Sequence, residues 1–231
     1  MDGANHLLSV LLRARPDEYR HLRTVELRQG QILAEPLARL NRVYFPYSGI
    51  ISFSVPLNDG HLVQAGMVGR DGEVGGLQCL NGKVSPNRIV VLVPGRAAVM
   101  EADQFTEIVQ ADPQRRSAFL SHEQFVLAEV QQSVACNAVH TVEQRMCRWI
   151  LRMNDLIGSK VPLTQELLAT MIAVRRTSVT GAATVLQKQG AIKYSRGHIQ
   201  IVDIERLKRS SCECYEAVRD HYDRIVIHHH S

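Results

Sequence analysis

The spacing of apolar and polar positions changes along the chain, and each change predicts a different kind of element. From about residue 25 to residue 100, short apolar runs alternate with turns that contain glycine, asparagine or proline, which is typical of antiparallel strands. These runs are Val25–Leu27, Gln31–Leu33, Arg42–Phe45, Gly49–Val55, Leu62–Val68, Asn87–Val93 and Ala97–Glu101. Asn58-Asp59-Gly60 between two of the runs predicts a tight hairpin. We therefore expect a small antiparallel barrel or roll.

Outside this region, apolar residues recur at helical spacing. Helices are predicted over His6–Ala14, Pro16–Leu22, Asp103–Gln110, Pro113–Val139, His140–Leu156 and Cys212–Ile227. Asp103 is expected to cap the third of these. In the fifth, the residues expected to be buried are Met146, Trp149, Ile150 and Met153. The long fourth helix separates the strand-rich half of the chain from a second helical region.

The long helix carries a seven-residue repeat. Its seam consists of Leu120, Glu123, Leu127, Val130, Val134 and Asn137. Phe119 and Val126 broaden the stripe. Such a repeat can pair with a second helix, or it can pack against the roll of its own chain. We expect it to pair with a second copy, with Asn137 setting the register.

The stretch Val161–Val202 predicts a winged helix-turn-helix. Thr164 is a suitable N-cap for a first helix of about eight residues, and Ala173-Val174 fits the short turn that follows. Arg175–Lys188 predicts the second helix, which Gly190 ends. Its residues expected to face inward are Val179, Ala182, Ala183, Val185 and Leu186. The two strands of the wing are predicted at Ile192–Tyr194 and His198–Val202, and an ordinary helical hairpin with a charged face is the alternative.

Charge is distributed unevenly over the 231 residues. Residues 141–231 carry 14 Lys and Arg against 9 Asp and Glu, whereas residues 1–140 carry 13 against 14. The positive charge therefore accompanies the helix-turn-helix, as expected for a module that binds a phosphate backbone. His228-His229-His230 resembles the start of a purification tag and enters no metal argument.

The cysteines and the apolar runs indicate the compartment. The five cysteines are scattered and odd in number, which favours a reduced, cytoplasmic protein. No apolar run approaches the roughly 20 residues of a membrane span, so no membrane partner is expected. The stretch Met1–Ser9 lacks the pattern of a secretory signal.

Five further stretches of the chain support a resemblance to a known family. Val43–Gly49 and Gly66–Gly75 are similar to the roll of the bacterial CRP/FNR transcription regulators, whose layout is a β-roll, a long helix and a winged helix-turn-helix. Cys136-Asn137, Val142–Trp149 and Cys212–Tyr215 resemble one large subgroup of that family whose signals are poorly defined. The resemblance covers about 220 positions and implies an α+β fold.

The resemblance also implies a division of the chain. The N-terminal helices and the cyclic-nucleotide-binding-like roll would form a sensor domain over residues 1–112. Residues 113–139 would form the dimerisation helix, residues 140–227 the DNA-binding domain, and residues 228–231 the remnant of a tag. The implied partners are double-stranded DNA with an inverted repeat, a second copy of the chain and RNA polymerase.

Specific residues are expected to contact DNA. Arg175 and Arg176 begin the second helix, whose N-terminal end enters the major groove in this motif. Because adjacent helical residues point about 100° apart, we expect Arg176 to contact bases and Arg175 to contact phosphate. The other candidate contacts are Thr164, Gln165, Thr177, Ser178, Thr180, Lys188, Lys193, Arg196 and His198. Better-known members carry a glutamate and a second arginine where this chain has Thr177 and Gly181, so their half-site sequences are not transferred.

The signal is less well defined. In cyclic-nucleotide-binding members, a Gly-Glu pair is followed about ten residues later by Arg-Ser. Here Glu73 is present, but Asn87 and Arg88 stand at the phosphate position, and Arg88 would point to the opposite face of a strand. These residues are the candidate effector pocket, with Glu73 as a structural turn residue the alternative, and cyclic nucleotide is not the expected ligand.

No cofactor and no metal are expected. No cysteine precedes Cys79, so the N-terminal iron–sulfur cluster of the oxygen-sensing branch is not expected, and His61 alone is weak support for haem. Cys212 and Cys214, two apart on a predicted helix, would point to different faces, so packed thiols are favoured over a redox pair or a metal site with Cys147. Two alternatives remain: a ligand-independent or thiol-controlled regulator of the same fold, and a metal-dependent β-barrel enzyme, for which the roll offers only one histidine.

Overall fold

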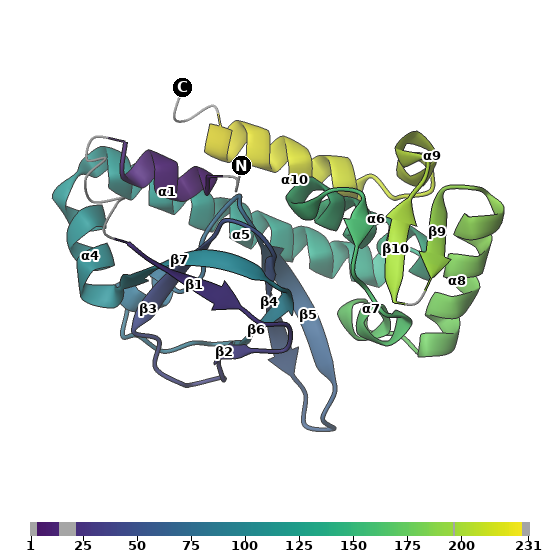
Figure 1. The fold of residues 1–231 in the computed structure, drawn as a ribbon, viewed down its shortest axis with the longest axis horizontal. Coiled ribbons are helices and arrows are strands. Elements are labelled where there is room, and N and C mark those ends of the chain that lie inside the picture. The colour runs from purple at the N-terminus through teal and green to yellow at the C-terminus, as the bar shows by residue number, and fades with distance from the viewer. Residues whose placement is uncertain (1–3, 14–21, 196, 228–231) are drawn as a thin grey trace. The chain divides into compact units, whose positions relative to one another are not determined.

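The computed structural model describes residues 4–13, 22–195 and 197–227 (Figure 1). These residues fall into two compact units. The first comprises the described residues of Met1–Ser54, Gly66–Leu127 and His221–Ser231, and the second comprises Val55–Ala65 and those of Ala128–Asp220. The predicted helix Pro16–Leu22, the tag residues 228–231 and Arg196 lie wholly or largely outside the described residues.

Seven antiparallel strands form the roll. They are β1 (Arg23–Leu27), β2 (Ile32–Ala34), β3 (Arg42–Pro46), β4 (Ile50–Pro56), β5 (Leu62–Val68), β6 (Arg88–Val93) and β7 (Gly95–Glu101). One sheet has the order β1-β7-β3 and the other the order β2-β6-β4-β5. All seven predicted strands are confirmed, with boundary shifts of at most two residues. The expected α+β class is also confirmed.

The predicted hairpin at Asn58-Asp59-Gly60 is confirmed. The amide of Leu57 donates to the carbonyl oxygen of His61 at 2.8 Å, which closes the turn between β4 and β5. Gly60 has φ +84°, a left-handed conformation that glycine adopts without steric cost. The Asp59 carboxylate accepts a hydrogen bond from the amide of His61 at 3.0 Å and so stabilises the turn.

The core of the first unit combines residues from the roll and the helices around it. Those helices are α1 (His6–Leu11), α3 (Gly76–Leu80), α4 (Ala102–Ala111) and the first half of α5 (Pro113–Val139). Phe45, Phe105 and Phe119 form a chain of aromatic contacts, with ring centroids 6.2 and 5.3 Å apart. Phe119, which was expected to broaden the apolar stripe of the long helix, is buried in this core and packs within its own chain.

The N-terminal cap of α4 differs from the expectation. Asp103 does not cap α4: the N-cap position is Glu101, and Asp103 lies in the first turn, where its carboxylate accepts a hydrogen bond from the Lys83 ammonium at 2.7 Å. Asn5 caps α1, and its amide nitrogen donates to the carbonyl oxygens of Pro46 and Gly72. This buried asparagine thereby ties the N-terminal helix to the roll.

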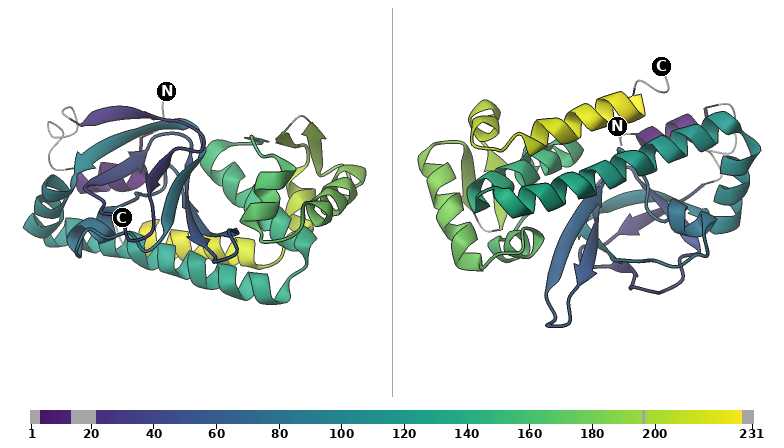
Figure 2. Two further views of the ribbon diagram at one scale, coloured as in Figure 1. Left: turned by 90° about the horizontal axis from the view of Figure 1, so that it is seen from below. Right: turned by 180° about the vertical axis from the view of Figure 1, so that it is seen from behind.

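The long helix α5 has the predicted bounds and runs without a break (Figure 2). A separate helix, α6 (Val142–Ile157), follows it. Thr141 is the N-cap of α6 and forms a reciprocal capping box with Gln144. The four residues of α6 predicted to be buried, Met146, Trp149, Ile150 and Met153, are all buried.

The remaining elements belong to the second unit. They are β8 (Lys160–Val161), α7 (Gln165–Met171), α8 (Arg176–Lys188), β9 (Ile192–Ser195), β10 (His198–Ile201), α9 (Ile204–Arg209) and most of α10 (Cys214–Tyr222), which a π-helical turn (Asp223–Ile227) follows. The three strands form one sheet of order β8-β10-β9. The prediction of a single helix from Cys212 is wrong, because Cys212 precedes α10, and α9 was not predicted.

Candidate nucleic-acid interface

Thr164 is the N-cap of α7, the first helix of the predicted motif. The backbone amide of Leu167 donates to the Thr164 hydroxyl at 3.1 Å, which satisfies one of the unpaired amides at the start of α7. Leu168, Ala169 and Met171 are buried on the inner face of this helix. The small Ala169 side chain allows α8 to pack closely against α7.

A tight turn joins the two helices. The amide of Val174 donates to the carbonyl oxygen of Ala169 at 3.0 Å. Ala173 has φ +52°, in the left-handed region that favours glycine. The guanidinium of Arg145 on α6 donates to the carbonyl oxygen of Ile172 and so anchors the turn to the helix behind it. The angle between α7 and α8 is therefore fixed by contacts on both sides of the turn.

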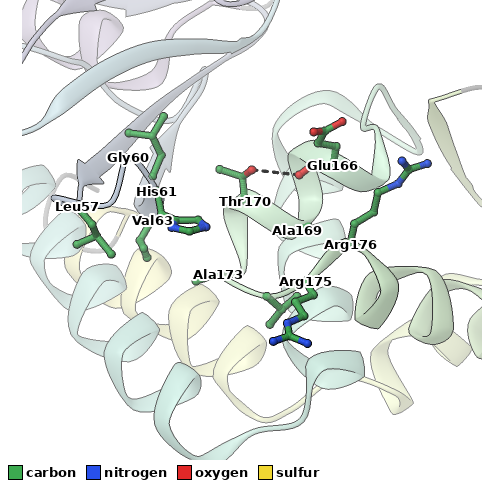
Figure 3. Close-up of a pocket in the computed structure, with 12 residues that line it drawn as sticks. Leu57, Gly60, His61, Val63, Glu166, Ala169, Thr170, Ala173, Arg175 and Arg176 are labelled. Atoms are coloured by element: carbon green, nitrogen blue, oxygen red, sulfur yellow. Dashed lines mark hydrogen bonds between the residues drawn. The ribbon is translucent and has the colours of Figure 1, made fainter.

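The N-terminus of α8 is exposed and electropositive. Arg175 is its N-cap in extended conformation, without a side-chain cap, and no acidic residue lies in the first turn. The exposed side chains there are Arg175, Arg176, Thr177 and Ser178. Free backbone amides, the helix dipole and two guanidinium groups together favour an anion at this end. Figure 3 shows the side chains of Arg175 and Arg176 pointing in different directions.

A side-chain contact links the two helices near this end. The Thr180 hydroxyl on α8 donates to the Gln165 side-chain oxygen at 2.8 Å, and it also lies 3.1 Å from the carbonyl oxygen of Arg176. Both Thr180 and Gln165 were predicted as DNA contacts. In the structure they also hold each other, which orients the exposed start of α8 relative to α7.

The wing follows as predicted, with β9 and β10 paired from His198 opposite Ser195 to Ile201 opposite Ile192. Tyr194 anchors it: its hydroxyl donates to the carbonyl oxygen of Leu163 at 3.1 Å, and burial raises the pKa of that hydroxyl. Lys193 and His198 are exposed, as is Lys188 in the last turn of α8. These basic side chains thus lie at the C-terminal end of α8 and on the wing.

This geometry agrees with the comparison with protein families. A model described as the Crp-like helix-turn-helix domain matches residues 144–210. The chain contains a Crp-like helix-turn-helix domain. No curated protein sequence matches the chain.

Solved structures extend the likeness to the whole fold. FixK2 from Bradyrhizobium japonicum superposes with a TM-score of 0.72 at 13% identity, over 83% of this chain and 98% of that chain. The CRP/FNR-family regulator TTHA1359 from Thermus thermophilus gives 0.67 at 20% identity, over 82% and 98%. The c-di-GMP-responsive regulator CLP from Xanthomonas campestris gives 0.66 at 13% identity, over 82% and 98%. The chain therefore has the fold of the CRP/FNR transcription regulators, and the resemblance seen in the sequence is confirmed.

An open groove adjoins the Crp-like domain. Leu57 and residues 60–63 of the β4–β5 hairpin line it together with residues from α7, the turn and the start of α8 (Figure 3). Both segments belong to the second unit. Arg175, Arg176 and Glu166 contribute its charged lining, and His61 lies on the hairpin side. The two arginines that were predicted to contact DNA thus also line this groove.

Glu73, predicted for an effector pocket, lies buried in the roll. Its carboxylate accepts a hydrogen bond from the amide of Gly76 at 2.8 Å, which stabilises the start of α3. Burial raises the pKa of Glu73 well above its ordinary value, and the neighbouring carboxylate of Glu123 adds to the rise. The side chain therefore has a structural role in the turn that precedes α3.

Arg88 and Asn87 are also engaged. The guanidinium of Arg88 donates from two nitrogens to the two carboxylate oxygens of Glu35, both at 2.8 Å. The carbonyl oxygen of Asn87 accepts a hydrogen bond from the Ser85 hydroxyl at 2.8 Å. A phosphate at Arg88 would have to displace Glu35, which supports the expectation that cyclic nucleotide is not the ligand.

The seam of α5 presents an apolar surface. Leu120, Leu127 and Val134 are 51%, 57% and 67% exposed. The other predicted seam residues differ in exposure: Asn137 is exposed, whereas Glu123 and Val130 are partly buried. The exposed residues beside the leucines are instead Gln124 and Gln131.

None of the described helices is both long and apolar enough to cross a membrane.

One cluster in the second unit was missed in the sequence. Cys136, His140, Cys212 and Cys214 bring three thiols and an imidazole together, with all ligand atoms within 4.8 Å of one another. The Cys-x3-His spacing at residues 136 and 140 was an available signal, because residues four apart share one face of a helix. The other half of the cluster was hidden by the wrong prediction that Cys212 lies within a helix.

Proposed function

We propose that this chain is a homodimeric, sequence-specific DNA-binding transcription regulator that senses a signal through its roll. The observation that carries the proposal is the exposed, uncapped N-terminus of α8, where Arg175 and Arg176 stand without an acidic neighbour in the first turn. In a Crp-like domain this end of the second helix is the part that enters the major groove. Residues 1–112 would sense the signal, residues 113–139 would dimerise, and residues 140–227 would bind DNA.

The two arginines have different roles in this proposal. Arg176 contacts a base edge, where a guanidinium can donate to guanine O6 and N7 together. Arg175, at the N-cap, contacts phosphate. Thr177, Ser178 and Thr180 contact base edges or phosphate near them, and Thr164 and Gln165 meet the backbone at the start of α7. Lys188, Lys193, Arg196 and His198 supply phosphate contacts from the end of α8 and from the wing.

The apolar seam of α5 supports dimerisation. A stripe of Leu120, Leu127 and Val134 exposed at seven-residue spacing is the pattern of a two-helix seam. A twofold dimer would place two copies of α8 in successive major grooves, so the site is an inverted repeat with half-sites about one helical turn apart. Selection of sites from a random DNA pool tests this directly: an enriched inverted repeat supports the proposal, and an enriched site without twofold symmetry contradicts it.

Replacing Arg176 by alanine is expected to weaken binding to the selected site by roughly 1–3 kcal/mol and to relax the base preference at one position of each half-site. The reason is the loss of a bidentate contact to a base. Fluorescence anisotropy with labelled duplexes, the selected site and variants at each position, measures both effects.

Arg28→Ala is the matched control, because Arg28 is an exposed arginine of the roll and its removal changes the net charge equally. That variant should keep the affinity and the base preference. If Arg176→Ala weakened all sequences equally, the side chain would be a phosphate contact, and the assignment of the two arginines would be wrong.

Gly181 offers a separate test of the same surface. It is exposed in the middle of α8, and an added Cβ would meet nothing within 4 Å. Gly181→Ala should therefore raise the free energy of unfolding by about 0.5–1 kcal/mol, because alanine has the higher helix propensity. If this face approaches DNA closely, the same variant binds the selected site more weakly. Thermal unfolding and anisotropy on one sample give both numbers, and unchanged affinity would place Gly181 away from the DNA.

A further inference from the structure

The thiol cluster joins two segments that are far apart in the sequence. Cys136 and His140 lie at the C-terminal end of the long helix, and Cys212 and Cys214 lie where the chain leaves the wing region and enters α10. The sulfurs of Cys136 and Cys212 are 3.6 Å apart, and the sulfur of Cys214 is 3.6 Å from Nδ1 of His140. All three cysteines are buried. Four soft ligand atoms therefore face one small volume.

These separations match those of a tetrahedral zinc centre. Zn–S bonds of about 2.3 Å place two sulfurs about 3.8 Å apart, and a Zn–N bond of about 2.0 Å places a sulfur and a nitrogen about 3.5 Å apart. A disulfide needs sulfurs at about 2.0 Å, and it would leave the third thiol and the imidazole unused. The arrangement of four ligand atoms thus favours a metal over a single oxidised pair.

The surroundings orient the ligands as a metal site requires. The second ring nitrogen of His140, Nε2, lies 3.2 Å from the carboxylate of Glu213, so the carboxylate fixes the tautomer that leaves Nδ1 free to bind. Gln132 donates from its amide nitrogen to the sulfur of Cys214 at 3.0 Å. Such outer contacts hold ligand side chains in the geometry of the bound state.

Buried positive charge complements a thiolate-rich centre. Three thiolates and a neutral imidazole around Zn²⁺ give a net charge of −1. Arg148 is buried, donates to the Ser133 hydroxyl at 2.8 Å, and has a second terminal nitrogen, Nη1, for which the described residues supply no hydrogen-bond partner. Ser133 precedes Cys136 by one helical turn on α5. A buried cation next to an anionic metal centre avoids part of the cost of an uncompensated charge.

We propose that Cys136, His140, Cys212 and Cys214 bind one zinc ion. Each thiol releases its proton to solvent on binding, and the ion then closes a Cys₃His tetrahedron that ties the end of α5 to the start of α10. The site is distinct from the surface proposed for DNA, and it stands or falls independently of the proposed function. Its consequence is a metal-dependent stability of the second unit.

The test uses reduced protein that lacks His228–His230, so that the tag histidines cannot bind metal. We expect one equivalent of zinc per chain by elemental analysis. We also expect one equivalent of Co²⁺ added to the metal-free protein to give the near-ultraviolet thiolate-to-cobalt band and the strong visible bands of tetrahedral coordination. Cys136→Ser and Cys214→Ser should abolish the thiolate band, while Cys79→Ser, at a buried cysteine of α3 in the first unit, should retain it.

A surface variant covers the case in which a cysteine variant fails to fold. Glu213 is 78% exposed, so Glu213→Gln should fold, and it should weaken zinc binding by about 10–100-fold in competition with a chromophoric chelator. Glu216→Gln, at an exposed residue of α10 three positions further along the chain, is the control and should leave the affinity unchanged. Metal-free protein that takes up no Co²⁺, iron and sulfide in place of zinc, or a Cys136–Cys212 disulfide in the protein as isolated would each overturn the zinc assignment.

Discussion

Replacing Leu127 by glutamate is expected to convert the proposed dimer to a monomer. Leu127 lies in the middle of the seam on α5 and is 57% exposed in the single chain. In a twofold dimer the substitution removes two buried leucines, about 3–6 kcal/mol in total, and places two carboxylates opposite each other. The dimer dissociation constant should rise by two to four orders of magnitude, since about 1.4 kcal/mol corresponds to a factor of ten. Sedimentation equilibrium measures it.

The same variant should lose nearly all specific DNA binding, because a monomer contacts one half-site instead of two. Leu77→Glu is the control: Leu77 is a leucine of similar exposure, 47%, on α3, and its replacement should leave the dimer intact. A dimer that persists in Leu127→Glu at micromolar concentration would show that the seam of α5 is not the interface.

The strands and the helix-turn-helix could be predicted because their signals are local. Each strand of the roll is an apolar run between turn residues, and Asn58-Asp59-Gly60 specifies its hairpin through the left-handed conformation of Gly60. Thr164 and Gly190 mark helix ends through hydrogen bonding and backbone conformation that involve only neighbouring residues. These elements therefore need no knowledge of the rest of the fold.

Side-chain environment depends on distant residues, and there the sequence was less informative. Phe119 and Leu120 are both apolar and adjacent on α5, yet the first is buried against Phe105 and the second is exposed. Val185 was predicted to face inward on α8 and is instead 40% exposed. A helical stripe identifies a face to within one neighbouring position, and the partner element decides which side of that face is covered.

The thiol cluster illustrates the same limit for sites. Cys136 and Cys212 are 76 positions apart, and their sulfurs meet only because the second unit folds α10 back against the end of α5. The sequence places Cys212 and Cys214 in a pattern that a helix would separate, whereas the non-helical residues before α10 let both approach one point. Convergence of this kind is a property of the tertiary fold.

Replacing Trp149 by alanine is expected to lower the free energy of unfolding of the second unit by about 3–5 kcal/mol. Trp149 is the largest of the fully buried side chains among the described residues, on the inner face of α6, and its removal leaves a cavity that the surrounding helices fill only in part. The guanidinium of Arg148 lies 4.8 Å from the centre of its ring, so a cation–π contact is lost as well. Urea denaturation followed by circular dichroism measures the change, because the variant has no tryptophan fluorescence.

Trp149→Phe separates the two contributions. Phenylalanine keeps an aromatic face for Arg148 and most of the buried volume, so the loss of stability should be smaller than for alanine. The folded fraction of either variant should bind the selected DNA site with unchanged affinity, since Trp149 lies in the core and the proposed DNA-binding surface is carried by α7, α8 and the wing. A stability loss below about 1 kcal/mol in Trp149→Ala would mean that the core around α6 repacks freely. The inference that Arg145 of α6 holds the turn before α8 rigidly would then be wrong.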